Sequence, residues 1–112
     1  MDISVRKQGT AQVIRLHGNL TLGDAVNSFS HTTEELLNEG ESRLVLNLAE
    51  VRMIDSSGIG AMVRVFTAAK KKGGTLMLVQ PSKMAVQTLK FVGLLNLFPI
   101  FEEEAQAVLA SQ

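Results

Sequence analysis

The segment that decides the fold reads Leu44-Val45-Leu46-Asn47-Leu48, and the loop after it reads Ile54-Asp55-Ser56-Ser57-Gly58-Ile59-Gly60. A nearly continuous run of large aliphatic residues is typical of a strand that is covered on both faces, as in a parallel sheet. In the loop, Asp55, Ser56 and Ser57 are candidate N-caps of a helix. We therefore expect a buried central strand that leads through an exposed loop into a helix.

The residues after the loop predict where this helix ends. Apolar residues recur at helical spacing from Ile59 to Ala69, and the stretch Lys70-Lys71-Lys72-Gly73-Gly74 follows. Lysine favours the negative end of a helix dipole, and glycine is common just beyond a helix. Thr75 to Val79 reads as a second buried strand. Residues 43–79 are therefore predicted to form a strand–helix–strand unit with a right-handed crossover.

The flanking segments complete an α/β pattern. Two alternating segments open the chain, and Gln8-Gly9-Thr10 between them predicts a hairpin turn. The other predicted elements are a helix from about Leu22 to Glu39, a helix from Pro81-Ser82 to Gly93, an edge strand over 97–101, and a last helix starting at Glu102-Glu103-Glu104. We expect a single α/β domain over residues 1–112. Its small mixed sheet is antiparallel in the first pair and parallel at the centre, with about four helices mainly on one face.

Composition excludes several classes of function. The chain has no cysteine, so thiolate catalysis and cysteine-based metal sites are ruled out. Its 11 basic and 11 acidic residues balance, and Trp and Tyr are absent, which argues against nucleic acid as a direct partner. With no signal-peptide pattern and no long apolar run, we expect a cytoplasmic protein without membrane insertion. His17 and His31 lack companions at ligand spacing, so we expect no metal and no catalytic role there.

Three catalytic or nucleotide-binding motifs fail at the 54–60 loop. A hydrolase nucleophile elbow needs glycine where Ile54 stands, two residues before Ser56. The sequence from Gly58 to Val63 lacks the third glycine of a dinucleotide fingerprint, and no Gly-Lys-Ser or Gly-Lys-Thr of a phosphate-binding loop is present.

Two interpretations of the loop remain open. In the structural one, the polar residues only cap the helix, and Gly58 and Gly60 let its first turn approach the sheet closely. In the functional interpretation, the loop has more short polar side chains than capping requires. A cap needs one such side chain, and the loop has Asp55, Ser56 and Ser57. At least one hydroxyl is then expected to face solvent at the positive end of a helix, where a phosphate is well accommodated.

The strand at 44–48, the 54–60 loop and Lys72-Gly73-Gly74 before the second buried strand resemble the bacterial anti-sigma factor antagonists, which are small stand-alone STAS domains. The resemblance implies a STAS-like fold and a protein that is not an enzyme and needs no cofactor. It implies that Ser56 is phosphorylated by the partner anti-sigma factor, an ATP-using serine kinase, and that a serine phosphatase reverses the modification. The unphosphorylated form would bind the anti-sigma factor and so release a sigma factor for transcription.

The resemblance also implies which residues contact the partner. Asp55, Ser56, Ser57, Gly58, Ile59 and Gly60 match the loop and the first helical turn. In the loop after the second strand, antagonists of this family often carry an acidic residue, whereas this chain has Asn19 and Thr21. These two side chains keep hydrogen-bonding capacity but carry no charge.

Two other functions stay open. One is a STAS scaffold subunit of a lipid-transport or stress-signalling assembly in which Ser56 is never modified. The other is a small nucleotide-binding protein or enzyme that uses the 54–60 loop. Two structural expectations also follow from the residues. The apolar segment 91–98 is expected to be core under the last helix rather than a partner surface, and Asn47 is expected to hydrogen-bond a neighbouring loop.

Overall fold

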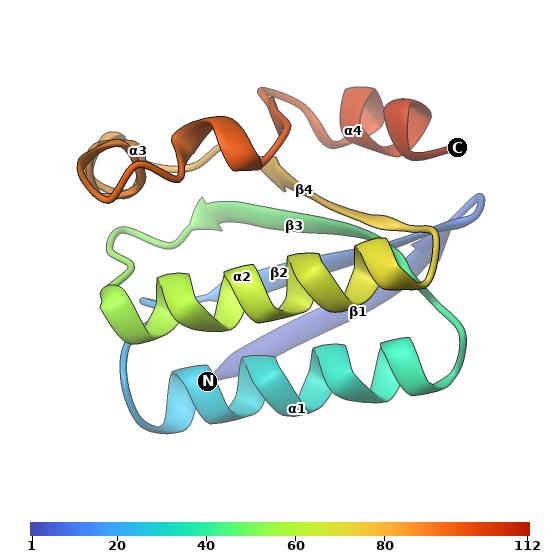
Figure 1. The fold of residues 1–112 in the computed structure, drawn as a ribbon, viewed down its shortest axis with the longest axis horizontal. Coiled ribbons are helices and arrows are strands. Elements are labelled where there is room, and N and C mark those ends of the chain that lie inside the picture. Colours follow the sequence, from blue (N-terminus) through green and yellow to red (C-terminus); the bar gives the residue numbers. More distant parts are fainter.

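The computed structural model describes residues 1–112 and contains one five-stranded sheet in the order β1-β2-β3-β4-β5 (Figure 1). Its strands are β1 (Asp2–Gln8), β2 (Ala11–His17), β3 (Arg43–Glu50), β4 (Thr75–Val79) and β5 (Ile100–Phe101). The β1–β2 pair is antiparallel and the other pairs are parallel. The predicted mixed sheet with an antiparallel first pair and a parallel centre is confirmed.

The helices cover the two faces of the sheet unequally. They are α1 (Asp24–Asn38), α2 (Ser56–Lys71), α3 (Lys83–Phe91) and α4 (Glu104–Ser111). Helices α1 and α2 lie side by side along one face, and α3 contributes Ala85 and Leu89 to the core cluster that they share (Figure 1). Helix α4 packs on β2, β3 and β4 from the other face. The prediction of helices mainly on one face is confirmed, and no helix is both long and apolar enough to span a bilayer.

The central strand β3 is buried from both sides, as its aliphatic run predicts. Leu44, Leu46 and Leu48 belong to the main cluster of 22 buried residues between the sheet and helices α1–α3. Val45 points the other way, into a cluster of 6 buried residues under α4. Because alternate side chains of a strand face opposite sides, only a strand covered twice needs apolar residues at every position.

The turn between α2 and β4 depends on glycine for steric reasons. A Cβ atom on Gly74 would lie 1.9 Å from the carbonyl oxygen of Ser42. At this contact the chain that enters β3 and the chain that enters β4 touch backbone to backbone, and Thr75 N–H donates to the same Ser42 oxygen at 2.9 Å. The Gly73-Gly74 pair therefore ends α2 and also sets the register of β4 beside β3.

The segment from Phe91 to Phe101 departs from the sequence prediction in two ways. Instead of an edge strand throughout 97–101, residues 95–97 form a short 3₁₀ helix, and β5 has two residues. Pro99 has no N–H for a sheet ladder, although its carbonyl accepts from Leu78 N–H at 2.9 Å. The expectation that 91–98 is core under the last helix is correct in part, because Phe98 is buried but belongs to the main cluster on the opposite face of the sheet from α4. Phe98 packs edge-on against Phe66 of α2, with ring centroids 5.4 Å apart, and Phe91 is 92% exposed.

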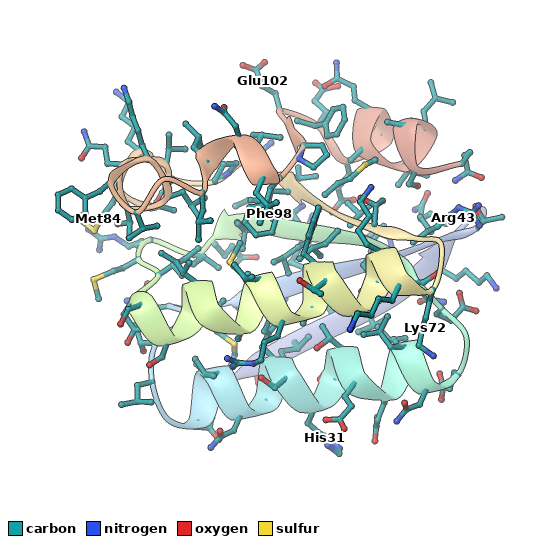
Figure 2. All side chains as sticks on the ribbon, in the orientation of Figure 1. His31, Arg43, Lys72, Met84, Phe98 and Glu102 are labelled. Carbon is teal, nitrogen blue, oxygen red and sulfur yellow. The ribbon has the colours of Figure 1, made fainter.

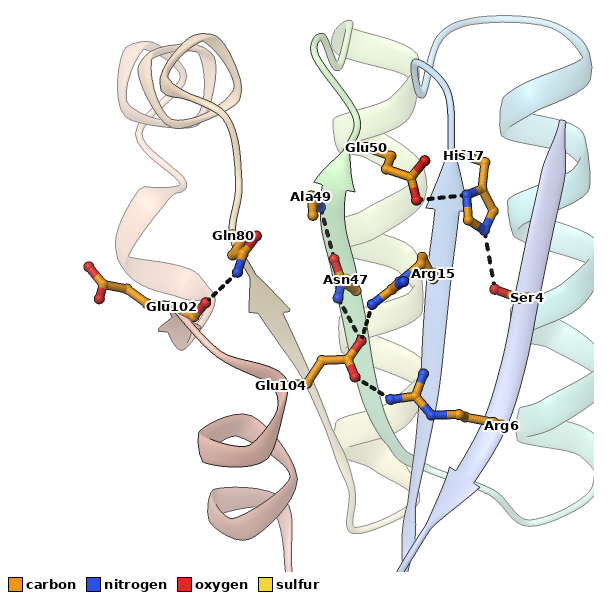
Figure 3. A network of polar contacts seen from close by, with 10 residues as sticks. All are labelled: Ser4, Arg6, Arg15, His17, Asn47, Ala49, Glu50, Gln80, Glu102 and Glu104. Carbon is orange, nitrogen blue, oxygen red and sulfur yellow. Dashed lines mark hydrogen bonds and ion pairs between the residues drawn. The ribbon is translucent and has the colours of Figure 1, made fainter.

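Helix α4 is fixed to the sheet by a network centred on Glu104 (Figure 3). Its carboxylate accepts from Asn47 Nδ2 at 2.6 Å and Arg15 Nη2 at 3.2 Å, and it pairs with Arg6. Asn47 was expected to bond a neighbouring loop, but its amide nitrogen reaches the first residue of α4 instead. Burial raises the pKa of Glu104, yet hydrogen bonds from Asn47 and Arg6 outweigh it and hold that pKa below its usual range.

We predict that Glu104→Gln lowers the free energy of unfolding by about 1–3 kcal/mol at neutral pH, because the charged hydrogen bonds are lost. Glu103→Gln is the matched control, since Glu103 is exposed and its side chain makes no cap bond. A lowered folded pKa means that the contribution of Glu104 is complete above the unfolded pKa of about 4.3 and disappears as pH falls through the folded pKa. Urea denaturation should show that the gap in free energy of unfolding between wild type and Glu104→Gln becomes smaller as the pH is lowered. A gap that persists unchanged to about pH 3 would contradict this account.

Candidate functional site

Asp55 ties the start of α2 to the loop after β2. Its Oδ1 accepts from Gly58 N–H at 2.9 Å, which is the N-cap of α2, and its Oδ2 accepts from Leu22 N–H at 2.9 Å. These backbone donors, Leu22 first and Gly58 second, lower the pKa of Asp55. The carboxylate is therefore ionised, and both of its oxygens are occupied by main-chain groups.

Gly58 brings α2 into direct contact with the same loop. A Cβ atom on Gly58 would lie 2.3 Å from the carbonyl oxygen of Leu20 and 2.8 Å from Cγ2 of Ile54. That carbonyl accepts from Asp55 N–H at 3.2 Å, so the close approach and the backbone bond occur at one place. The predicted close approach is correct for Gly58. It is wrong for Gly60, where the nearest atom to an added Cβ is Nη1 of the Arg64 side chain at 3.5 Å.

Asn19 completes the junction between the two loops. Its Oδ1 accepts from the N–H groups of Arg52 and Met53, at 3.2 and 3.1 Å. Leu20 N–H also donates to Met53 carbonyl oxygen at 3.1 Å. Asn19 is exposed, but its side-chain oxygen is used by two main-chain donors, whereas Thr21 is half-buried and its side chain has no hydrogen bond. The structure brings the segment around Asn19 and Thr21 together with the 54–60 loop.

Ser56 is the exposed residue of the loop. It is the first residue of α2, it is exposed, and its hydroxyl makes no hydrogen bond within the protein. The expectation that one hydroxyl faces solvent is confirmed for this serine. Ser57 and Gly60 are half-buried, whereas Gly58 and Ile59 are buried. The Ile59 side chain is 5% exposed and packs in the main core, so it supports the loop from below.

Three exposed apolar residues near this loop were not found from the sequence. Leu22 is 78% exposed, Met53 41% and Met84 54%. The hydroxyl of Ser82, which caps α3, donates to Arg52 carbonyl oxygen at 2.8 Å, and this bond holds the start of α3 beside the 51–55 loop. Figure 2 shows Met84 at the end of the molecule where α2 begins. In the sequence, Leu22 is interpreted as the start of a helical pattern. A single methionine does not indicate whether its side chain is buried or exposed.

The histidines and the pockets lie apart from Ser56. His17 Nδ1 lies 2.9 Å from Glu50 Oε2 (Figure 3), and His31 pairs with Glu35 one turn later on α1. No group of three His, Cys, Asp or Glu residues is placed to hold a metal ion. One hollow is a groove of about 200 Å³ between α1 and α2, lined by Ser30, Thr33, Glu34, Leu37, Ala61, Arg64, Val65 and Ala68.

Comparison with known proteins identifies the family. The profile described as STAS domain matches residues 2–107, so the chain belongs to the STAS domain family. This confirms the resemblance to the STAS domains of anti-sigma factor antagonists. The anti-sigma F factor antagonist of Paenibacillus polymyxa is 24% identical over 108 residues, covering 96% of this chain and 92% of that protein.

Two further relatives agree. A Thermotoga neapolitana protein named as a candidate anti-sigma factor antagonist is 28% identical over 75 residues, covering 67% of this chain. That match spans 66% of the relative, just under two thirds of its length. The structure of the anti-sigma factor antagonist SpoIIAA in its unphosphorylated form superposes with a TM-score of 0.82 at 22% identity, covering 96% of this chain and 93% of that one. At this identity the likeness establishes the fold.

The two glycines of the loop give a paired test of its packing. Gly58→Ala should lower the free energy of unfolding by about 1–3 kcal/mol, because the added methyl group overlaps a backbone oxygen that cannot move aside cheaply. Gly60→Ala should raise it by up to about 1 kcal/mol, because alanine is the better helix former and the space is open. Urea denaturation of both variants checks the pair. Equal effects at the two positions would show that the contact between Gly58 and Leu20 is not tight.

The Asp55 carboxylate should make stability depend on pH in acid. Because its folded pKa is lowered, its contribution is complete above the unfolded value of about 3.9 and is lost as pH falls through the folded pKa. Asp55→Asn keeps one acceptor but removes the charge, so it should cost about 1–2 kcal/mol at pH 7. Its stability should then change less than that of wild type between about pH 5 and pH 2. Parallel acid profiles of the two proteins would contradict this role.

Proposed function

We propose that this protein is a phosphorylation-switched anti-sigma factor antagonist. In its unphosphorylated form it binds an anti-sigma factor that is also a serine kinase, and this binding releases a sigma factor for transcription. Phosphorylation of Ser56 by that kinase prevents binding, and a serine phosphatase restores it. The observation that carries the proposal is the free, exposed hydroxyl of Ser56 at the first position of α2.

The position of Ser56 suits reversible phosphorylation. A phosphate adds a charge of about −1.5 to −2, and the amino terminus of a helix accommodates such a charge well. Asp55 already caps α2, so the serine hydroxyl is not needed for folding. The modification therefore changes the surface that a partner meets while the domain stays folded.

The size of the required effect is modest. A tenfold to hundredfold loss of affinity needs about 1.4–2.8 kcal/mol, and moving a partner from 99% to 1% bound needs roughly 5.5 kcal/mol. A strongly hydrated dianion inside an interface supplies the smaller amount through desolvation and repulsion. Exposed Leu22, Met53 and Met84 give the surface around Ser56 the apolar side chains that a protein interface buries.

Two features favour binding over catalysis at this loop. Both Asp55 oxygens accept main-chain hydrogen bonds, so this carboxylate is not free to act as a general base. The hollows of the surface lie elsewhere, between α1 and α2, beside the 3₁₀ helix and at the start of β4. In the proposed function, ATP belongs to the kinase, and the protein contributes an acceptor hydroxyl and a docking surface.

Substitution of Ser56 tests the switch. With each purified anti-sigma factor kinase of the source organism, Ser56→Ala should bind within a few-fold of wild type and should not be phosphorylated. Ser56→Glu should bind at least about tenfold more weakly, which corresponds to 1.4 kcal/mol. Isothermal calorimetry measures binding, and mass spectrometry of protein from native cells shows whether Ser56 carries phosphate. Equal affinity of the two folded variants, or a Ser56 that is never modified in cells, would favour the scaffold function.

A further inference from the structure

The surface around Ser56 is assembled from three chain segments that hydrogen bonds hold together. Asn19 Oδ1 joins the loop after β2 to the 51–55 loop, and the Ser82 hydroxyl joins the start of α3 to Arg52. We call the exposed side chains of these segments the docking surface. Besides Asn19, whose side-chain oxygen is used within the protein, it consists of Leu22, Arg52, Met53, Lys83 and Met84, together with Ser56 at the start of α2.

The free charge of the docking surface is positive. Arg52 and Lys83 are exposed, and neither side chain makes an ion pair or a hydrogen bond in the protein. The acid within these segments is Asp55, whose two oxygens each accept a main-chain N–H at 2.9 Å. Positions 19 and 21, in the loop after β2, carry no charge.

A third free cation lies along α2. Arg64 is exposed and unpaired, and its Nη1 lies 3.5 Å from where a Cβ on Gly60 would be. Its guanidinium therefore lies over Gly60, and Gly60 is itself about one helical turn from Ser56 along α2. The acid Glu34 of α1 lines the same groove as Arg64 but makes no ion pair with it.

The acids of the neighbouring elements are Asp2 of β1, Asp24 just at the start of α1, and Glu50, the last residue of β3, and two of them are engaged. Asp24 pairs with the amino group of Met1 at 2.5 Å, and Glu50 pairs with His17. Asp2 is exposed on the edge strand β1, which β2 separates from β3. With Asp24 and Glu50 paired, the unpaired charges of the 51–55 loop, α2 near Ser56 and the start of α3 are the cations Arg52, Arg64 and Lys83.

We propose that the docking surface recognises an acidic patch on the anti-sigma factor kinase and that phosphorylation works as a charge switch on it. This inference rests on the proposed function. When Ser56 is unphosphorylated, Arg52 and Lys83 attract the acidic residues of the partner, and Arg64 adds to the positive electrostatic potential of the surface. A phosphate at Ser56 places about two negative charges among these cations, which offsets their attraction and repels the partner's acids.

Charge reversal on the docking surface tests the partner's chemistry. Arg52→Glu and Lys83→Glu should each weaken binding of the kinase that binds wild type by about tenfold or more, mainly by lowering the association rate. The matched control is Lys72→Glu, because Figure 2 shows Lys72 at the other end of α2 and its effect should stay within about twofold. Wild-type affinity should also fall as NaCl rises from about 0.05 to 0.5 M. Circular dichroism and urea denaturation verify that each variant is folded.

A neutral substitution at Ser56 separates charge from bulk. Ser56→Gln matches Ser56→Glu in size but has no charge, so it should retain most of the affinity that Ser56→Glu loses, and added salt should narrow the difference. Equal losses for Gln and Glu would show that bulk rather than charge blocks the partner, and this would overturn the charge switch.

The remaining outcomes distinguish the inference from the proposed function. If Arg52→Glu and Lys83→Glu bind like Lys72→Glu, or bind more tightly than wild type, the acidic partner patch is refuted. A continuing loss of binding by Ser56→Glu would leave the proposed function standing in that case. If no kinase binds wild type, the proposed function and the inference that rests on it are both overturned.

Discussion

The arrangement around Ser56 depends on one carboxylate that serves two backbone donors. Asp55 accepts from Gly58 N–H inside α2 and from Leu22 N–H in the loop after β2. A single cap would fix only the start of the helix, whereas the second bond fixes the neighbouring loop against it. Because Asp55 performs the capping, the serine beside it is left with an unused hydroxyl, although serine is itself a common N-cap. The exposure of Ser56 is thus a consequence of how the helix is started.

The central unit of the fold was predictable because its signals are local. The aliphatic run of β3 and the lysine–glycine end of α2 each determine one element without help from distant residues. The packing of α4 on the second face of the sheet was not predictable in the same way. It depends on Glu104, which meets Asn47 from β3 and Arg15 from β2, and no spacing in the sequence indicates that contact. Likewise, the burial of Phe98 against Phe66 and the proline at position 99 shorten β5 for reasons that only the packed structure reveals.

The same distinction between local signals and contacts formed by packing applies to the candidate site. Ser56 could be identified because three short polar residues exceed what a cap requires, and that surplus is visible in the sequence. Arg52, Met53, Lys83 and Met84 could not be assigned to the same surface, because they come from two segments about 30 residues apart that the Ser82 hydroxyl joins. The role predicted for Gly60 failed because a glycine in a sequence indicates open or crowded space equally well. Only the neighbouring atoms show that Gly58 is crowded and Gly60 is not.

The same hydrogen bonds limit what phosphorylation of Ser56 can do to the structure. A phosphate at Ser56 would repel the Asp55 carboxylate, but Ser56 is exposed, so water and salt screen the repulsion, and the amino terminus of α2 favours the added charge. Each hydrogen bond of the ionised Asp55 contributes about 1.5–3 kcal/mol, and there are two. We therefore expect these bonds to keep the loop in place when Ser56 is phosphorylated. A partner that discriminates between the two forms would then do so through the charge and hydration of the surface it contacts, rather than through a rearranged backbone.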